Sequence, residues 1–285
     1  ADIEPKIETQ EIEIDTHIDT PIMYEMLTND IKNILVDSPT GSGKTTSVIN
    51  AAKQYLNLHP DAYIYIAVPT KALATQVAEK HNLGQPLIDR ISVFDVMNKN
   101  LAKTSKRLFV GSYDKSNKFI NQVPVKNGAI IIADEVHKEV IDYGYRKDAI
   151  TRLFNLRDDD RVLKFIGLSG TTQEIDLAKY DKRYIISKRD NKPIFDEFIT
   201  VPYHHSKSFT EIVTNMIASE IKRGNKALVF VNNKSIIETI SRTLSKQGYK
   251  VSTITSDTAN LSKSVHYRKL LHNEKFPDAD ALIAT

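Results

Sequence analysis

The run Thr40-Gly-Ser-Gly-Lys-Thr45 combines small, hydroxylated and cationic residues in an order that suits the binding of phosphate groups. Gly41 and Gly43 allow backbone conformations that a Cβ atom would block, so successive N–H groups can point at phosphate oxygens. The Lys44 ammonium would reach the β- and γ-phosphates, and the Thr45 hydroxyl would ligate Mg²⁺. The run therefore predicts a nucleoside triphosphate site formed by Thr40, Gly41, Ser42, Gly43, Lys44, Thr45 and Thr46.

A simple Gly/Ser turn is the alternative interpretation of this run, since Ser38 stands where the usual pattern has its first glycine. A predicted strand before the run and a predicted helix from Lys44 favour phosphate binding, because the helix would add its positive dipole end. A phosphate loop alone does not discriminate among kinases, GTPases, transporters and helicases.

The segment Ile130–His137 places two carboxylates directly after an apolar run, which predicts a buried strand that ends in acidic side chains. An aspartate delivered in this way beside a phosphate loop is the second Mg²⁺-binding element of such nucleotide hydrolases. Asp134 would hold the metal together with Thr45, and Glu135 would orient or deprotonate the attacking water. The alternative is a surface Asp-Glu pair at a strand end. The catalytic candidates are thus Lys44, Asp134 and Glu135.

Short apolar runs alternate with helical stretches through the first two thirds of the chain, and these runs are continuous in apolar character. Such runs are typical of strands buried on both faces of a parallel sheet and connected by crossover helices. Glu11–Asp15 instead alternates polar and apolar residues, which predicts a short strand at a sheet edge. Further strands are expected at 31–36, 62–68, 107–110, 129–133 and 162–168, and helices at 44–58 and 71–81.

A second α/β series follows a looser, proline-containing stretch at 190–205. Helices are expected at 209–222, 235–247 and 261–272, and strands at 226–231, 250–254 and 279–284. Three strands are few for such a sheet, so the second unit looks truncated. The predicted organisation is an acidic N-terminal extension at 1–20, a nucleotide-binding domain at 21–203 and an incomplete second domain at 204–285.

The tetrad Asp134-Glu-Val-His137 resembles motif II of the superfamily 2 helicases of the DEVH/DEAH-box type. Other segments resemble further motifs of that family in the family's order: Pro69–Gln76 motif Ia, Val110–Asp114 the motif Ib region, Leu168–Thr171 motif III, Ala227–Asn233 motif IV, and Ala281–Thr285 the start of motif V. Each short match is weak by itself, whereas their order and spacing across 38–285 make the joint match specific. The resemblance implies an α/β fold with two RecA-like P-loop domains that have parallel sheets, the second one truncated.

The resemblance also implies roles for residues outside the phosphate loop. ATP and Mg²⁺ would bind in the cleft between the two domains. Coupling between nucleotide and nucleic acid would involve His137, Ser169 and Thr171. Single-stranded nucleic acid would contact Pro69, Thr70, Lys71, Ser112, Tyr113 and Asn232, mainly through its phosphates. The alternatives are a core-covering role for Tyr113, an ordinary turn at 169–171 and a strand end at Asn232.

Two elements of the family pattern are not found. A glutamine-containing adenine-recognition element before the phosphate loop is not evident, and motif VI with its arginine fingers is absent. Such arginines contribute about 10³–10⁵ in rate. Residues 1–285 alone are therefore expected to hydrolyse ATP poorly, either as a fragment of a longer helicase or because the C-terminal part is absent from the sequence.

The composition is that of an ordinary globular protein, with 41% hydrophobic and 26% charged residues. No run approaches the roughly 18 apolar residues of a membrane span, so no membrane association and a cytoplasmic location are expected, in the host cytoplasm if a phage encodes the chain. The lack of cysteine excludes disulfides and thiolate metal sites. Residues 1–20 hold seven acidic side chains against one lysine, so the remainder carries a positive excess that suits a polyanion. The acidic segment would contact a protein partner or form an ordinary edge strand.

The favoured function is an ATP-dependent helicase or translocase on single-stranded nucleic acid. DNA is favoured over RNA, with a role in replication of a phage or mobile element, because Asp134–His137 and Val110–Asp114 resemble helicases of that kind. The alternatives are a nucleotide-switched nucleic-acid-binding module without unwinding activity and a P-loop kinase.

Overall fold

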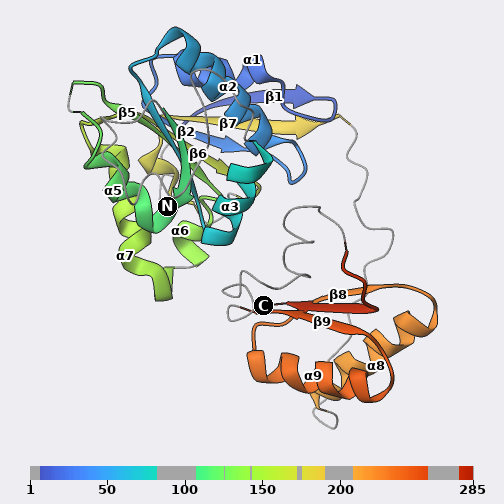
Figure 1. The fold of residues 1–285 in the computed structure, drawn as a ribbon. Helices are drawn as coiled ribbons and strands as arrows, with labels where there is room; N and C mark the ends of the chain where they lie inside the picture. The colour runs from blue at the N-terminus through green and yellow to red at the C-terminus, as the bar shows by residue number, and fades with distance from the viewer. Residues whose placement is uncertain are drawn as a thin grey trace, which may run out of the picture. The chain divides into compact units, whose positions relative to one another are not determined.

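The chain divides into two compact units, residues 1–192 and 193–285, in a computed structural model (Figure 1). The structure describes residues 7–81, 107–124, 126–141, 143–171, 175–189, 208–255 and 276–284. The expected domain boundary at 203, the proline-containing stretch at 190–205 and the helix expected at 261–272 lie outside these residues.

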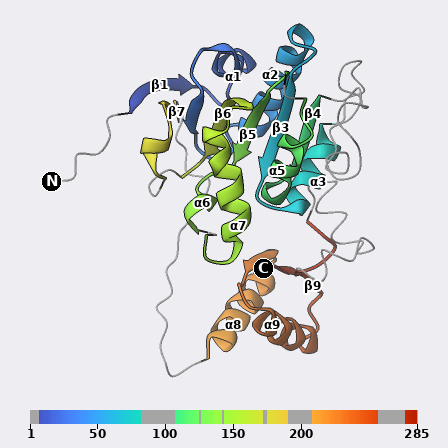
Figure 2. The same ribbon diagram turned by 90° about the vertical axis from the view of Figure 1, so that its left-hand side faces the viewer.

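A parallel sheet of seven strands forms the centre of the first unit, in the order β1-β7-β2-β6-β5-β3-β4. Figure 2 shows β1 and β7 at the end of the sheet away from β3 and β4. The strands are β1 (Glu8–Ile14), β2 (Asn33–Asp37), β3 (Tyr63–Val68), β4 (Leu108–Ser112), β5 (Ala129–Asp134), β6 (Val162–Ser169) and β7 (Lys182–Lys188). Every residue of β3 and β5 is buried, which explains their uninterrupted apolar sequences.

Helices cover both faces of this sheet, and the strand residues alternate between the two cores. Ile64 and Ile66 of β3 pack with the first three long helices, whereas Tyr65 packs on the opposite face with α5 and α7. The helices are α1 (Thr20–Thr28), α2 (Lys44–Leu58), α3 (Lys71–Lys80), α5 (Ser116–Ile120), α6 (Lys138–Ile141) and α7 (Tyr143–Phe154), with 3₁₀ turns η2 (Tyr113–Lys115), η3 (Asn155–Asp158) and η4 (Leu177–Lys179). This doubly covered sheet confirms the predicted α/β class.

The described residues of the second unit form a three-stranded parallel sheet in the order β8-β10-β9. Its described elements are α8 (Phe209–Lys222), β8 (Ala227–Phe230), α9 (Lys234–Lys246), β9 (Val251–Ile254) and β10 (Ala281–Ala284). The side chains of Ser208 and Asn233 cap α8 and α9 by accepting hydrogen bonds from the backbone N–H groups of Glu211 and Ile236. Ile217, Ile240 and Ile283 meet in its core.

The acidic segment near the N-terminus pairs with the sheet. β1 runs parallel to β7 at the sheet edge, as its alternating sequence predicts. Glu8 forms an ion pair with Lys182 at 2.9 Å, and Glu13 and Asp15 both pair with Arg189 at 2.8 Å. The acidic side chains therefore complement the basic residues of the neighbouring strand and its end.

The sequence-based predictions included neither α1 nor β7 of the first unit. In β7 only Tyr184 and Ile186 are buried, because the strand lies one place from the sheet edge and its other residues meet solvent or ion-pair partners. Among the described helices, none combines the length and apolar character that crossing a bilayer requires.

Candidate nucleotide site

Parallel strands β2, β6 and β5 are neighbours, so the loops that leave their carboxyl ends meet at one edge of the sheet. Asp37 lies opposite Ser169, and Asp134 lies opposite Leu168. This register brings the run at 38–45, the carboxylates at 134–135 and the segment at 169–171 together, although they are far apart in sequence.

The phosphate loop connects β2 to α2. Gly41 and Gly43 have φ angles of 70° and 73°, in the left-handed region where glycine has no steric cost. Gly43 is the residue that precedes the first turn of α2, so the free N–H groups of that turn face the loop. The backbone conformation of the run therefore accounts for the two glycines.

Internal hydrogen bonds hold the loop in shape. Lys44 is almost buried, and its Nζ donates to the carbonyl oxygen of Ser38 at 3.1 Å. The Ser38 and Ser42 hydroxyls, both fully buried, lie 2.5 Å apart. Ser38 therefore replaces the usual first glycine with a side chain that closes the loop through its hydroxyl. From β7, Lys188 Nζ donates to the Gly41 carbonyl at 3.0 Å.

The metal-binding candidates are in contact. Thr45 Oγ1 donates to Asp134 Oδ2 at 3.2 Å, and the other Asp134 oxygen accepts from the Glu135 N–H at 3.0 Å. A hydroxyl and one carboxylate, completed by phosphate oxygens and water, are the donor set that Mg²⁺ uses with nucleotides. The residues present therefore fit the predicted metal.

Burial changes the acidity of Asp134. The side chain lies at the buried end of β5, and loss of hydration, reinforced by the neighbouring Glu135 carboxylate, raises the pKa of Asp134 to about 6. Lys44 and the Thr45 hydroxyl act in the opposite direction. A carboxylate that is costly to ionise without a counter-ion gains most when a divalent cation binds beside it.

Glu135, His137 and Ser169 form a chain of polar contacts. His137 Nδ1 lies 3.2 Å from Glu135 Oε2 and 3.0 Å from Ser169 Oγ. The Ser169 hydroxyl donates to the Thr171 carbonyl at 2.6 Å and accepts from the Thr171 N–H at 3.1 Å. Glu135 itself has a φ of 58°, the left-handed region that side chains rarely adopt. Of the three coupling candidates, His137 thus contacts the base candidate directly, and Ser169 and Thr171 are linked to it through His137.

Tyr113 is placed differently from the prediction. Its side chain is 1% exposed, and its hydroxyl donates to the carbonyl oxygens of Asp134, at 2.5 Å, and Glu135, at 3.1 Å. A side chain buried in this way is not available to stack on a nucleic-acid strand. The Tyr113 side chain instead supports the backbone of the two carboxylates from within the core, so a nucleic-acid contact at this residue would involve its backbone.

The other nucleic-acid candidates of the first unit lie at the carboxyl ends of β3 and β4, next to the nucleotide site in the sheet order. Thr70 is exposed, and its hydroxyl accepts from the Leu73 N–H at 3.2 Å at the start of α3. Ser112 is largely buried. Pro69 presents its carbonyl to an arginine, and the side chain of Lys71 lies outside what the structure describes.

Asn232 belongs to the second unit, where it is exposed directly after the carboxyl end of β8. Its neighbour Asn233 caps α9.

Sequence reasoning missed Arg146 of α7. Its NH1 group donates to the Pro69 carbonyl, and its NH2 group pairs with Asp114 Oδ2 at 2.7 Å. No local signal marks this arginine, because its partners lie 77 and 32 residues away in the sequence.

A cavity of about 400 Å³ opens beside the phosphate loop. It is lined by His17, Ile18, Thr20, Gly41, Gly43, Thr46, Ser47, Asn50 and Lys80. The Ile18 N–H donates to the Ser42 carbonyl at 2.9 Å, so the segment before α1 packs directly on the loop. The segment also precedes the phosphate loop in the sequence. No adenine-recognition motif is evident in that part of the sequence.

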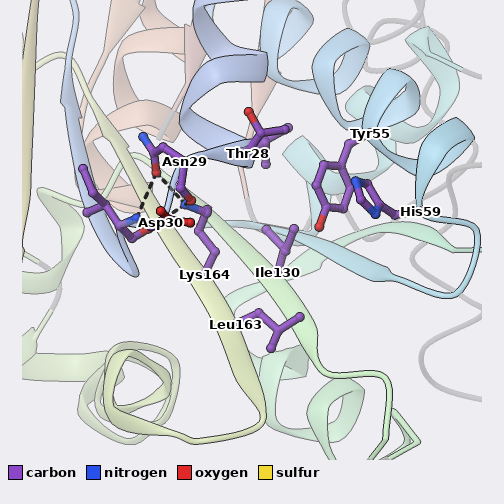
Figure 3. Close-up of a pocket in the computed structure, with 10 residues that line it drawn as sticks. Thr28, Asn29, Asp30, Tyr55, His59, Ile130, Leu163 and Lys164 are labelled. Atoms are coloured by element: carbon purple, nitrogen blue, oxygen red, sulfur yellow. Dashed lines mark hydrogen bonds between the residues drawn. The ribbon is translucent and has the colours of Figure 1, made fainter.

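A second pocket lies at the opposite, amino-terminal edge of the sheet (Figure 3). Lys164 in this pocket donates to the carbonyl and side-chain oxygens of Asn29, both at 2.7 Å, and to the Ile31 carbonyl at 2.6 Å. All three ammonium hydrogens are used, and burial lowers the pKa of Lys164 to about 8. Lys164 therefore fixes the turn between α1 and β2 and is separate from the nucleotide site.

Comparison with solved structures supports the fold. Saccharomyces cerevisiae Dbp5 bound to RNA and ADP BeF3 superposes with a TM-score of 0.62 at 13% identity, covering 92% of this chain and 67% of that one. The helicase MrfA bound to DNA superposes with a TM-score of 0.60 at 15% identity, covering 93% of this chain and 41% of that one. These helicases share the RecA-like architecture.

Two of the relatives found by sequence comparison are distant and much longer than this chain. An uncharacterized protein of Methanocaldococcus jannaschii, MJECL28, is 26% identical over 269 residues, which are 88% of this chain and 20% of that protein. The DExH-box ATP-dependent RNA helicase DExH14 of Arabidopsis thaliana is 25% identical over 236 residues, 71% of this chain and 11% of that protein. The chain thus spans a fifth or less of the length of these relatives. The family model of the DEAD/DEAH box helicases matches residues 16–178, more than half of the sequence, and the chain belongs to that family.

Proposed function

We propose that this chain binds ATP with Mg²⁺ and couples ATP hydrolysis to movement on single-stranded nucleic acid, as part of a helicase. The observation that carries the proposal is the contact between Thr45 and Asp134 at 3.2 Å, directly beside the left-handed glycines of the loop. A hydroxyl and a carboxylate brought together beside a phosphate loop form a nucleotide–metal site.

Each polar residue of the site has a role in this proposal. Lys44 would neutralise the β- and γ-phosphates, and Thr45 with Asp134 would hold the metal. Mg²⁺, when bound, would supply positive charge to the phosphate oxygens. Glu135 would accept a proton from the attacking water as the bond between the γ-phosphorus and the bridging oxygen breaks, leaving ADP and phosphate.

The contacts of His137 with Glu135 and Ser169 support a coupling role. The Ser38 N–H donates to the Ser169 carbonyl at 2.8 Å, so the same segment also touches the phosphate loop. A change at the γ-phosphate could therefore alter the contacts of Ser169 in two ways, through the phosphate loop and through His137.

The cavity beside the loop is the proposed base site. His17 packs against Gly43, since a Cβ atom at Gly43 would lie 3.0 Å from His17 Cδ2. An imidazole ring here can stack on a purine, and the polar side chains of Thr20 and Asn50 can bond to its edge. These three residues provide the base contact that no sequence motif predicted.

The nucleic acid is proposed to cross the carboxyl ends of β3 and β4. The N-terminus of α3 and the turn after Ser112 offer backbone N–H groups that bind phosphates without reading sequence. Single-stranded DNA is the proposed partner, in replication of a phage or mobile element, on the resemblance of the segments at 110–114 and 134–137. Because one similar helicase was solved with RNA and another with DNA, the experiments must include both single-stranded RNA and single-stranded DNA.

The test is the rate of phosphate release from ATP by the full-length protein, with and without single-stranded DNA or RNA, together with a strand-displacement assay. Lys44→Ala should weaken nucleotide binding at least tenfold, and Glu135→Gln should bind ATP but lower turnover by at least a hundredfold. Lys179→Ala and Glu11→Gln are matched controls, because both side chains are exposed, on η4 and on β1.

The outcomes separate the alternatives. Normal turnover in both site variants would contradict the proposed site. ATP-dependent binding of nucleic acid without strand displacement or translocation would favour a nucleotide-switched binding module. A DNA preference requires greater stimulation by DNA than by RNA of the same length.

A further inference from the structure

Arg146 joins two loops at the proposed nucleic-acid face of the first unit. Its guanidinium donates through NH1 to the Pro69 carbonyl after β3, and through NH2 to Asp114 Oδ2 after β4 at 2.7 Å. The arginine side chain is only 18% exposed. Such charge-assisted bonds from one rigid, planar group fix the two loops relative to each other.

The backbone of α7 is distorted at this arginine. Arg146 has φ −124° and ψ 26°, which interrupt the helix in its first turn and a half. The two guanidinium bonds therefore start from the junction between two helical segments of α7.

The same guanidinium reaches the catalytic carboxylates through one aromatic ring. Its central carbon lies 5.9 Å from the ring centroid of Tyr113, and the Tyr113 hydroxyl bonds to the carbonyls of Asp134 and Glu135. Glu135 has a left-handed backbone conformation. The peptide groups on either side of it set the direction of its side chain, so contacts that fix these peptide groups also fix the carboxylate. Tyr113 holds these peptide groups from within the core.

We propose that Arg146 and Tyr113 are positioning residues that transmit the binding of a nucleic-acid strand, at the loops of Pro69 and Asp114, to the backbone of Asp134 and Glu135. This inference rests on the proposed function, since it needs a strand at those loops. It names a route distinct from the contacts of His137 with Ser169.

The physical basis is a short series of contacts with little freedom. A strand that contacts the loop after β3 or β4 shifts the acceptors of Arg146, and the guanidinium shifts with them. The Tyr113 ring, fully packed, moves with the arginine or loses its contact, and its hydroxyl carries the change to both carbonyls. Coupling of this kind is reciprocal, so nucleotide must affect strand affinity by the same factor.

The test is a coupling ratio: the affinity for a fluorescent non-hydrolysable ATP analogue with a saturating single-stranded oligonucleotide, divided by the affinity without it. Arg146→Gln and Tyr113→Phe each remove the hydrogen bonds and keep most of the volume. We expect each variant to reduce the ratio at least fivefold toward one. Arg152→Gln, an exposed arginine of the same helix, should keep the wild-type ratio.

A purely structural role would give a different result. It would lower thermal stability and weaken both ligands, but leave the ratio unchanged. If Arg146→Gln does not fold, as judged by its melting curve, Asp114→Asn tests the same link, because it keeps the shape but removes the charge. Arg146→Lys should restore part of the ratio, since an ammonium keeps the charge but lacks the planar fork with which the guanidinium spans both acceptors.

The results distinguish this inference from the function on which it rests. A wild-type chain that binds both probes, with a ratio unchanged in Arg146→Gln, Tyr113→Phe and Asp114→Asn, would overturn the route and leave the proposed function standing. A wild-type chain that binds neither probe would overturn both. Reduced ratios in these variants together with a normal ratio in Arg152→Gln support the route.

Discussion

The Thr45 hydroxyl donates to a carboxylate oxygen of Asp134 at 3.2 Å, although 89 residues separate the two in the sequence. Thr45 lies in the first turn of α2, and Asp134 is the last residue of β5. The strand order places β6 between β2 and β5, and this arrangement brings the two side chains to the same side of the phosphate loop. The pair is the geometric basis of the proposed metal site.

Removal of the Thr45 hydroxyl should weaken the metal-bound nucleotide selectively. Thr45→Val keeps the shape of the side chain but deletes the metal ligand and the hydrogen bond to Asp134. We expect the affinity for Mg²⁺-ATP to fall about tenfold, which corresponds to about 1.4 kcal/mol, with little change for ATP in EDTA. Titration of a fluorescent nucleotide with and without Mg²⁺ measures both. Thr45→Ser should retain near wild-type affinity, and equal losses in the two conditions would contradict a role as metal ligand.

Neutralisation of Asp134 should stabilise the metal-free protein while abolishing metal binding. Because burial raises the pKa of Asp134 to about 6, the native state binds a proton more tightly than the unfolded chain does. The contribution of this carboxyl to the free energy of unfolding therefore falls as the pH rises from about 4 to about 6. Asp134→Asn should increase that free energy by about 1–3 kcal/mol above pH 6.

Urea unfolding in EDTA at pH 7.5 and pH 4 measures this effect. The gain of Asp134→Asn should be present at pH 7.5 and absent at pH 4, where the wild-type carboxyl is largely protonated. Asp61→Asn, at an exposed aspartate, is the control and should change little at either pH. A gain of the same size at both pH values would contradict desolvation of the charge as its cause.

At Glu135, the left-handed backbone should make the glycine variant more stable than the alanine variant, which is the reverse of the usual order of stability. At a φ of 58° a side chain has a steric cost that glycine avoids, so Glu135→Gly should be more stable than Glu135→Ala by about 0.5–1 kcal/mol. Both variants should bind nucleotide and fail to turn it over. At Glu238, exposed within α9, alanine should instead be the more stable by about 1 kcal/mol. Denaturant unfolding of the four variants measures the two differences.

Replacement by alanine should affect stability differently at two glycines of the site, because their backbone conformations differ. A Cβ at Gly41 would meet only Lys188 Nζ, at 3.8 Å, and one at Gly170 would meet the Ser38 carbonyl oxygen at 3.4 Å, so both positions have room. Only Gly41 has a positive φ, of 70°. Gly41→Ala should therefore lower the free energy of unfolding by about 1–2 kcal/mol, whereas Gly170→Ala should change it by less than about 1 kcal/mol. Similar losses of unfolding free energy in both variants would indicate steric crowding by the added Cβ atom and would contradict a conformational cause.

Most elements of the fold were predictable because their signals are local. The helix expected at 44–58 agrees with α2 in both bounds, and that at 209–222 agrees with α8. The central strands are buried on both faces, so their apolar runs are unbroken. By contrast β7 has only three consecutive apolar residues, Tyr184–Ile186, between charged and polar ends, and its assignment depends on β1, which pairs with it from a distant part of the chain.

The sequence by itself was enough to predict the phosphate loop, the two carboxylates and the family. These features depend on residue types and their order within short segments, so they can be recognised without knowing the fold. The tertiary structure decided which side chains meet. The hydroxyl of Tyr113 reaches backbone carbonyls 21 and 22 residues away, and Lys188 reaches a loop 147 residues away. Arg146 likewise meets Asp114 only because α7 packs beside the turn that follows β4. Such contacts depend on strand order and packing, which no local pattern encodes.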